Sequence, residues 1–252
     1  MKRIRSLFNT CVSRLKDLLF PPRCICCSEL LPWGSEEMCD DCRLEYENAK
    51  LFECGECGKP LPLCDCVYRE YQAKRIRGFL KLYVYDPHTP ASAENLLIYR
   101  VKNKNLYAAH RFLAKELSKG VMRTTIGNQE DWYLTFPPRS RRAIHKYGFD
   151  HMKAFAAVCS REWGIQLCDC FRRRGGRIQK GLHGADARIK NATASYALKR
   201  NVSLSGRRFI IIDDVVTSGA TLRRCSELLY GAGAKCVVWV SIAMTKRKKT
   251  DF

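Results

Sequence analysis

The amino-acid sequence predicts an α/β fold, with a mostly parallel sheet and helices on both faces, preceded by a small cysteine-rich metal-binding module. Two observations carry this prediction. Strands and helices are expected to alternate from residue 79 to residue 243, and this order builds a parallel sheet. Nine of the fifteen cysteines lie between residues 24 and 66, and close cysteine pairs are typical of metal ligands.

Three regions are expected along the chain. Residues 1–20 are basic and carry apolar residues at helical spacing before Pro21 and Pro22, which predicts an amphipathic helix. This helix is expected to pack on the protein, with a membrane surface as the alternative. Residues 21–69 are expected to form the metal module with little regular structure, and residues 70–252 the α/β domain.

The elements of the α/β domain follow in chain order. Alternating apolar residues rich in aromatics predict a strand over 79–85, and Ser92 suits the N-cap of a helix over 92–101. A basic, glycine-rich stretch without apolar periodicity predicts a loop over 172–190. By the same patterns, strands are expected over 132–136, 208–213 and 235–243, and helices over 108–122, 149–163 and 221–231.

Four close cysteine pairs indicate two zinc sites. A Cys-x-x-Cys knuckle lets two thiolates hold one Zn²⁺, and two knuckles complete a tetrahedron. The simplest pairing joins the first two pairs and the last two, while an interleaved pairing and Cys26 in place of Cys27 stay open. Because no histidine precedes His88, the sites are expected to be closed and structural. Iron–sulfur ligation and disulfides fit less well. The predicted ligands are Cys24, Cys27, Cys39, Cys42, Cys54, Cys57, Cys64 and Cys66.

The segment 209–222 points to a sugar-phosphate site. An apolar run that predicts a buried strand ends at Asp213 and Asp214, and a short hydroxyl-rich loop with one glycine leads into a helix. Ligands of parallel α/β sheets bind beyond the carboxyl ends of strands. Backbone N–H groups and hydroxyls at a helix start suit a phosphate. The paired carboxylates suit vicinal hydroxyls or a hydrated Mg²⁺.

This order of residues resembles the 5-phosphoribosyl-1-pyrophosphate (PRPP) motif of type I phosphoribosyltransferases, in which apolar residues precede two acids, two apolar residues and Thr-x-Gly-x-Thr. The resemblance implies that Asp213 and Asp214 meet the ribose hydroxyls and that residues 217–221 hold the 5′-phosphate. The implied PRPP-binding set is Asp213, Asp214, Val215, Val216, Thr217, Ser218, Gly219, Ala220 and Thr221.

Over nearly the whole chain, the sequence resembles the ComF family, which includes the GntX proteins. The resemblance rests on Leu-Phe-Pro-Pro-Arg-Cys at 19–24, the double zinc-ribbon-like cysteine pattern and the PRPP loop. The family shows Arg, Asn and Gln where this chain has Tyr147, Asp150 and His151. An acidic Asp150 pointing into the site would repel an anion, so the substitutions favour PRPP binding over turnover. The implied pyrophosphate and loop candidates are Lys102, Arg139, Arg141, Arg142, Gln179 and Arg188.

The resemblance implies transfer of ribosyl 5-phosphate from PRPP, with Mg²⁺, to an acceptor that the sequence does not identify. The family is linked to DNA uptake in natural competence, which implies single-stranded DNA and a DNA-uptake helicase as partners. A net charge of +20 suits an anionic partner. A non-catalytic single-stranded DNA-binding factor and a PRPP-sensing regulator are the alternatives. With no recognisable signal peptide or membrane span, a cytoplasmic location is expected. Homo-oligomer formation stays open.

Overall fold

The computed structural model describes residues 21–35, 37–67, 76–125, 131–173, 195–200 and 202–245. The helix expected over 1–20 and all but the first two residues of the loop expected over 172–190 lie outside this part of the chain, and so do Gln179 and Arg188.

A five-stranded sheet forms the centre of the α/β domain, and every pairing in it is parallel. The strand order is β1-β7-β6-β2-β3. The prediction of a mostly parallel sheet is therefore confirmed. The strands are β1 (Ile76–Tyr85), β2 (Trp132–Thr135), β3 (Gln166–Leu167), β6 (Arg208–Val216) and β7 (Cys236–Thr245).

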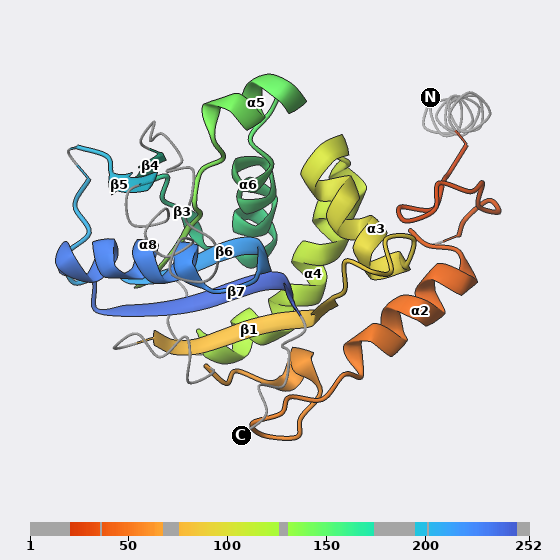
Figure 1. Ribbon diagram of the computed structural model, residues 1–252, viewed down its shortest axis with the longest axis horizontal. Coiled ribbons are helices and arrows are strands. Elements are labelled where there is room, and N and C mark those ends of the chain that lie inside the picture. The colour runs from red at the N-terminus through yellow and green to blue at the C-terminus, as the bar shows by residue number, and fades with distance from the viewer. Residues whose placement is uncertain are drawn as a thin grey trace, which may run out of the picture.

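Helices cover both faces of the sheet, as the sequence predicts (Figure 1). On one face, Ile210 and Ile212 of β6 pack in a core with α3, α4 and α6. On the other face, Phe209 and Ile211 pack in a core with α8. Alternate residues of a strand point to opposite faces, so the continuous apolar run serves both cores. The helices are α3 (Ala93–Tyr99), α4 (Tyr107–Thr124), α6 (His151–Trp163) and α8 (Ala220–Gly231).

Several elements differ from those expected. The expected helix over 92–101 is α3 followed by a π-turn, η3 (Arg100–Lys104). The helix α5 (Arg141–Tyr147), capped by Ser140 and ended by Gly148, was not predicted. The strand expected over 208–213 continues to Val216. The first residues of the expected loop 172–190 belong to a separate antiparallel ribbon of β4 (Phe171–Arg173) and β5 (Tyr196–Leu198).

The cysteine-rich region contains more regular structure than expected, namely α2 (Asp40–Lys50) and the short turn η1 (Leu61–Leu63). The buried ring of Tyr46 in α2 meets the ring of Tyr83 in β1 edge to face, with centroids 5.8 Å apart. The N–H of Phe79 donates to the Asp65 carbonyl at 2.9 Å. The region therefore packs along β1, the edge strand, and pairs one of its backbone N–H groups.

Candidate functional site

The loop after β6 turns directly into α8 and encloses a small pocket. Gly219 has a φ of 66° and forms the N-cap of α8, a left-handed conformation that glycine adopts at little cost. The first N–H groups of a helix lack partners within the helix and suit an anion. The pocket is about 40 Å³ in volume and is lined by Asp213, Val215, Val216, Thr217, Ser218, Gly219, Ala220, Thr221 and Leu222.

Asp214 is buried at the end of β6 and is held by the side chains of Lys102 and His151. Its Oδ2 lies 2.9 Å from Lys102 Nζ and 2.9 Å from His151 Nε2. Its Oδ1 accepts from the N–H of Val215 at 2.6 Å. Burial opposes ionisation of this carboxyl, but Lys102 and His151 outweigh that effect and hold the pKa of Asp214 well below its usual range. Asp214 is therefore a carboxylate with its oxygens already engaged.

Asp213, the other member of the acidic pair, has its pKa shifted in the opposite direction. Burial and the neighbouring Asp214 charge raise the pKa of Asp213 to about 8. Its Oδ1 accepts from the N–H of Asp214 at 3.0 Å. Unlike Asp214, it lines the pocket. The site thus holds one ionised carboxylate and one that gives up its proton near pH 8, an arrangement found where like charges share a site.

Lys102 reaches Asp214 from the π-turn η3, an element that often occurs at functional sites. The turn is anchored at its start, where Arg100 donates from Nε and Nη2 to the Cys26 carbonyl at 3.1 and 2.8 Å. It ends at Asn105, whose φ is 48°. Asp214 raises the pKa of Lys102 even though burial acts in the other direction. The structure therefore brings Lys102, a residue predicted for the site, onto the acidic pair.

Arg139 is tied to the protein by the residues that depart from the family pattern. Asp150 accepts from the Arg139 N–H at 2.9 Å and caps α6 through Met152 and Lys153. The Arg139 guanidinium lies 4.2 Å from the Tyr147 ring centroid and donates to the Lys102 carbonyl at 3.0 Å. Asp150 is thus used as a helix cap. Arg141 and Arg142 lie exposed on α5, and no described contact brings them to the acidic pair.

Three residues at the site escaped the sequence analysis. His151, noted in the sequence only as a departure from the family pattern, hydrogen-bonds Asp214. Burial raises the pKa of Asp213, and Arg173 of β4 partly opposes that rise. Tyr196 of β5 interacts with Thr221. The Arg173 guanidinium lies 5.3 Å from the Tyr196 ring centroid. Nothing in the local sequence links these residues to β6.

The eight predicted metal ligands gather in two groups. Within each group, the ligand atoms lie within 4.8 Å of one another, so each group could hold a metal ion. The first joins the first two cysteine pairs and the second joins the last two, which is the simplest pairing that the sequence allowed. Cys27, and not Cys26, belongs to the first group. The groups are Cys24, Cys27, Cys39 and Cys42, and Cys54, Cys57, Cys64 and Cys66.

The two groups are built on knuckles of the same backbone design. The N–H of Ser28 donates to the Cys24 carbonyl at 3.0 Å, and the N–H of Gly58 donates to the Cys54 carbonyl at 2.8 Å. Ser28 and Gly58 both have positive φ, 71° and 67°. Each knuckle is closed by an antiparallel bridge, from residue 23 to 30 and from residue 53 to 60. The offset is thirty residues at each of these points, so the first knuckle of the second group repeats that of the first group.

A buried lysine ties the second cysteine group to the sheet. Lys81 of β1 is 1% exposed. Its ammonium donates to Cys64 Sγ at 3.2 Å, to the Cys66 carbonyl at 3.1 Å and to the Phe79 carbonyl at 3.0 Å. A positive charge in this place offsets the negative charge that thiolates carry when they bind a metal.

Residues 179–251, which include β6, the loop after it and α8, match the family described as the phosphoribosyl transferase domain. Over 234 residues the chain is 27% identical to the DNA utilization protein YhgH of Escherichia coli O157:H7, which covers 88% of this chain and 97% of that protein. Over 63 residues it is 35% identical to the adenine phosphoribosyltransferase of Mycolicibacterium smegmatis, which covers 25% of this chain and 35% of that enzyme.

A solved structure is also similar, at low overlap. A hypoxanthine-guanine phosphoribosyltransferase of Bacillus anthracis is 16% identical, covers 57% of this chain and 73% of its own, and has a TM-score of 0.37. The sequence matches and the cysteine groups together confirm the predicted resemblance, a phosphoribosyl transferase domain preceded by cysteines that could hold metal ions. Among the described residues, no helix is long and apolar enough to cross a lipid bilayer.

Proposed function

We propose that this chain binds PRPP with Mg²⁺ at the loop after β6 and transfers its ribosyl 5-phosphate to an acceptor that is still to be identified. The observation that carries the proposal is the acidic pair beside the glycine- and hydroxyl-rich start of α8, within the matched domain. The N–H groups and hydroxyls of residues 217–221 would hold the 5′-phosphate. Asp213 would accept hydrogen bonds from the ribose hydroxyls.

The donor set fits Mg²⁺. This ion keeps several waters and binds through one or two carboxylates together with substrate phosphates. Asp213 lines the pocket, whereas Asp214 is engaged by Lys102 and His151. Asp213 is therefore the residue that would contact the hydrated ion, with Asp214 fixing the geometry. When bound, Mg²⁺ would offset charge on the departing pyrophosphate.

The first experiment is calorimetric titration of Mg²⁺-PRPP. Wild-type protein is expected to bind, and the Asp213→Asn/Asp214→Asn variant is expected to lose at least about 1.5–3 kcal/mol of binding free energy, because charged hydrogen bonds to the diol are removed. Glu227→Gln, an exposed substitution on α8, is the matched control and should bind as wild type. Equal affinity of the double variant and wild type would rule out the proposed site.

A second measurement separates an enzyme from a PRPP-sensing regulator. In transfer, the bond between C1 of the ribose and the pyrophosphate oxygen breaks, a bond to the acceptor forms, and pyrophosphate leaves. Pyrophosphate release in the presence of candidate bases, nucleotides or DNA supports the transferase. Binding without release for every acceptor supports the regulator.

The two cysteine groups are part of the same proposal, as structural zinc sites. Four thiols without a histidine or an open position suit closed tetrahedral Zn²⁺. Zinc thiolates persist in a reducing compartment, so we also place the protein in the cytoplasm.

A role in handling single-stranded DNA is the second candidate. It is supported by the net charge of +20 and by the relative that is named a DNA utilization protein. In this case a DNA-uptake helicase is the proposed partner. Binding of a labelled oligonucleotide, followed by fluorescence anisotropy, should weaken steeply as salt rises, because phosphate contacts release counterions. No binding at low salt would remove this candidate.

A further inference from the structure

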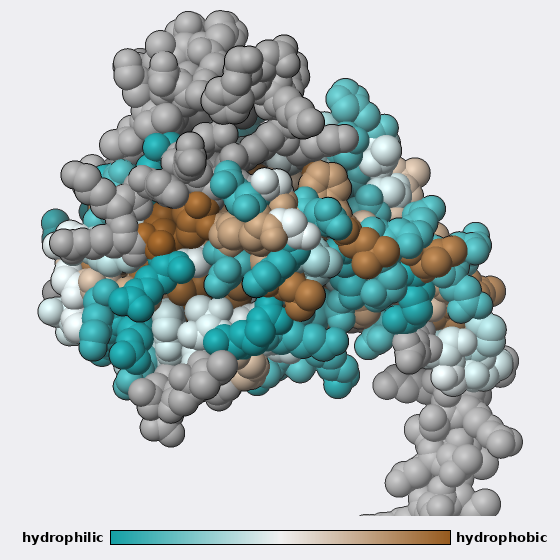
Figure 2. Space-filling model, turned by 90° about the horizontal axis from the view of Figure 1, so that it is seen from below, coloured by the Kyte–Doolittle hydropathy of each residue, from teal (hydrophilic) through white to brown (hydrophobic). Residues whose placement is uncertain are grey.

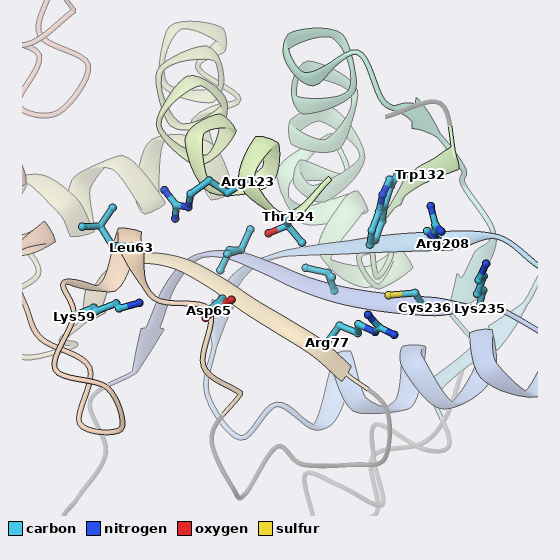
Figure 3. Close-up of a pocket in the computed structure, with 12 residues that line it drawn as sticks. Lys59, Leu63, Asp65, Arg77, Arg123, Thr124, Trp132, Arg208, Lys235 and Cys236 are labelled. Atoms are coloured by element: carbon cyan, nitrogen blue, oxygen red, sulfur yellow. The ribbon is translucent and has the colours of Figure 1, made fainter. Parts of the chain in front are cut away.

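A large basic groove opens at the end of the sheet opposite to the loop after β6 (Figure 3). It has a volume of about 860 Å³ and lies between the second half of the cysteine-rich region and the first residues of β1, β2, β6 and β7. Its charged lining consists of Lys59, Asp65, Arg77, Arg123, Arg208 and Lys235. Pockets of this size usually take a small ligand or one part of a larger one.

The groove and the proposed PRPP pocket cannot share one small ligand. Arg208 begins β6 and Val216 ends it, and each lines a different cavity. Eight steps along a strand at about 3.3 Å each separate them by roughly 26 Å. The groove is therefore a second, independent site.

The charges of the groove favour an anion. Five cations and one carboxylate line it, a formal balance of +4 (5 − 1). Arg208 is fixed by Asp131 at 3.0 Å, and Arg123 donates to the Pro62 carbonyl at 2.8 Å. Within the described ranges, the side chains of Lys59, Arg77 and Lys235 have no hydrogen-bond or ion-pair partner. These three cations are available to a ligand, and the two held arginines keep the rim in place.

The floor of the groove is apolar, unlike its rim. Trp132, Leu80 and Val238 line it from β2, β1 and β7. The face of the molecule seen from below shows separate apolar patches between predominantly hydrophilic residues (Figure 2). The groove crosses four neighbouring strands, β1, β7, β6 and β2, a width of about 14 Å at 4.8 Å per strand step. A row of cations over this width can meet more than one phosphate group.

We propose that this groove is a second ligand site that binds nucleotides, with phosphates on the cationic rim and the base against the apolar floor. The shared chemistry is a phosphate ester joined to a flat ring, and a free nucleotide or a single strand can supply it. Unlike the PRPP proposal, this inference does not involve Asp213, Asp214 or Mg²⁺, so either can fail without the other.

The test compares two charge-reversal variants with the same change in net charge. Arg77→Glu/Lys235→Glu alters the groove, and Lys115→Glu/Lys119→Glu alters exposed lysines of α4 that do not line it. The probes are a labelled oligothymidylate, followed by anisotropy, and adenosine diphosphate, followed by calorimetry. A milder variant, Arg77→Gln/Lys235→Gln, guards against misfolding, and thermal melting checks all three proteins.

At least one probe is expected to bind the wild type at low salt and to bind the groove variant about tenfold or more weakly. For the oligonucleotide, the log–log salt slope should fall by roughly 1–2, since up to two phosphate contacts are lost. If the groove variant loses binding of the oligonucleotide only, the natural ligand is a single strand. If it loses binding of adenosine diphosphate, the natural ligand is a free nucleotide. Both results support the site. Mg²⁺-PRPP binding should stay unchanged. Equal weakening in the groove and control variants, or no binding of either probe to the wild type, would overturn the inference.

Discussion

Replacing Lys81 by methionine tests how the second cysteine group is joined to the sheet. Lys81 is 1% exposed and donates to Cys64 Sγ and to the carbonyls of Cys66 and Phe79 at 3.0–3.2 Å. Methionine keeps much of the volume of the aliphatic chain but removes the charge and all three donors. The thiolate and two carbonyls then face an apolar group in a dry environment.

The magnitude follows from these contacts. Hydrogen bonds from a charged group contribute about 1.5–3 kcal/mol each, so three of them amount to roughly 4–9 kcal/mol. The variant no longer buries an ammonium group, which recovers several kcal/mol. A net loss of about 2–4 kcal/mol is expected. In a domain of this size, it corresponds to a fall in melting temperature of roughly 4–16 °C.

The assay combines thermal melting with zinc release to a chromogenic chelator. Lys81→Met should melt lower than wild type and release about one zinc ion per chain faster, because only the second group loses its positive neighbour. Lys59→Met, an exposed lysine of the same region, is the matched control and should change stability by no more than about 0.5 kcal/mol. If Lys81→Met and Lys59→Met had the same melting temperature and retained zinc equally, the buried ammonium would have no part in holding the second group.

Four further predictions concern other parts of the molecule. Metal analysis of the purified protein should find about two zinc ions per chain, and chelation should abolish the fold of the cysteine-rich region, since metal binding and folding are coupled in such modules; zinc-free protein with an unchanged melting profile would contradict this. Affinity for Mg²⁺-PRPP should rise as pH increases through about 8, because Asp213 must lose its proton, and Asp213→Asn should flatten the profile in calorimetry at several pH values. The same raised pKa means that the fold loses stability as pH rises from about 4 toward 8, since the folded carboxyl keeps a proton that the unfolded chain releases near 3.8. Lys102→Met should cost only about 1 kcal/mol in denaturant unfolding, since the Lys102 side chain is 39% exposed and solvent screens its pairing with Asp214; a loss above about 3 kcal/mol would show that the pair behaves as a buried one.

Contiguous patterns in this chain were predictable, and contacts between distant segments were not. Strands β1, β2, β6 and β7 were expected because each carries an apolar run or alternation of four residues or more. Strand β3 has only two residues, Gln166 and Leu167, which give no periodic signal. The short helix α5 has no buried residue, so it lacks the apolar stripe by which a helix is found in sequence.

The same distinction applies to the site. The pocket after β6 is built from adjacent residues, so a local motif was enough to locate it. The partners of Asp214 were different, because Lys102 and His151 come from segments 112 and 63 residues away. Only the packing of α6 and the π-turn against β6 brings them together. Lys102 entered the prediction through family resemblance, whereas His151 departs from that pattern and was missed.

The number of residues in the π-turn between α3 and α4 sets the rotation of one helix relative to the other. At its start Arg100 binds the Cys26 carbonyl, and two residues later Lys102 binds Asp214. A π-turn contains one residue more than an α-helical turn would accommodate. Removing one residue between 103 and 105 would therefore turn the following helix by about 100° relative to the preceding one. Such a deletion would leave the spacing of Arg100 and Lys102 unchanged, but it would turn away from α6 the face of α4 that packs on it.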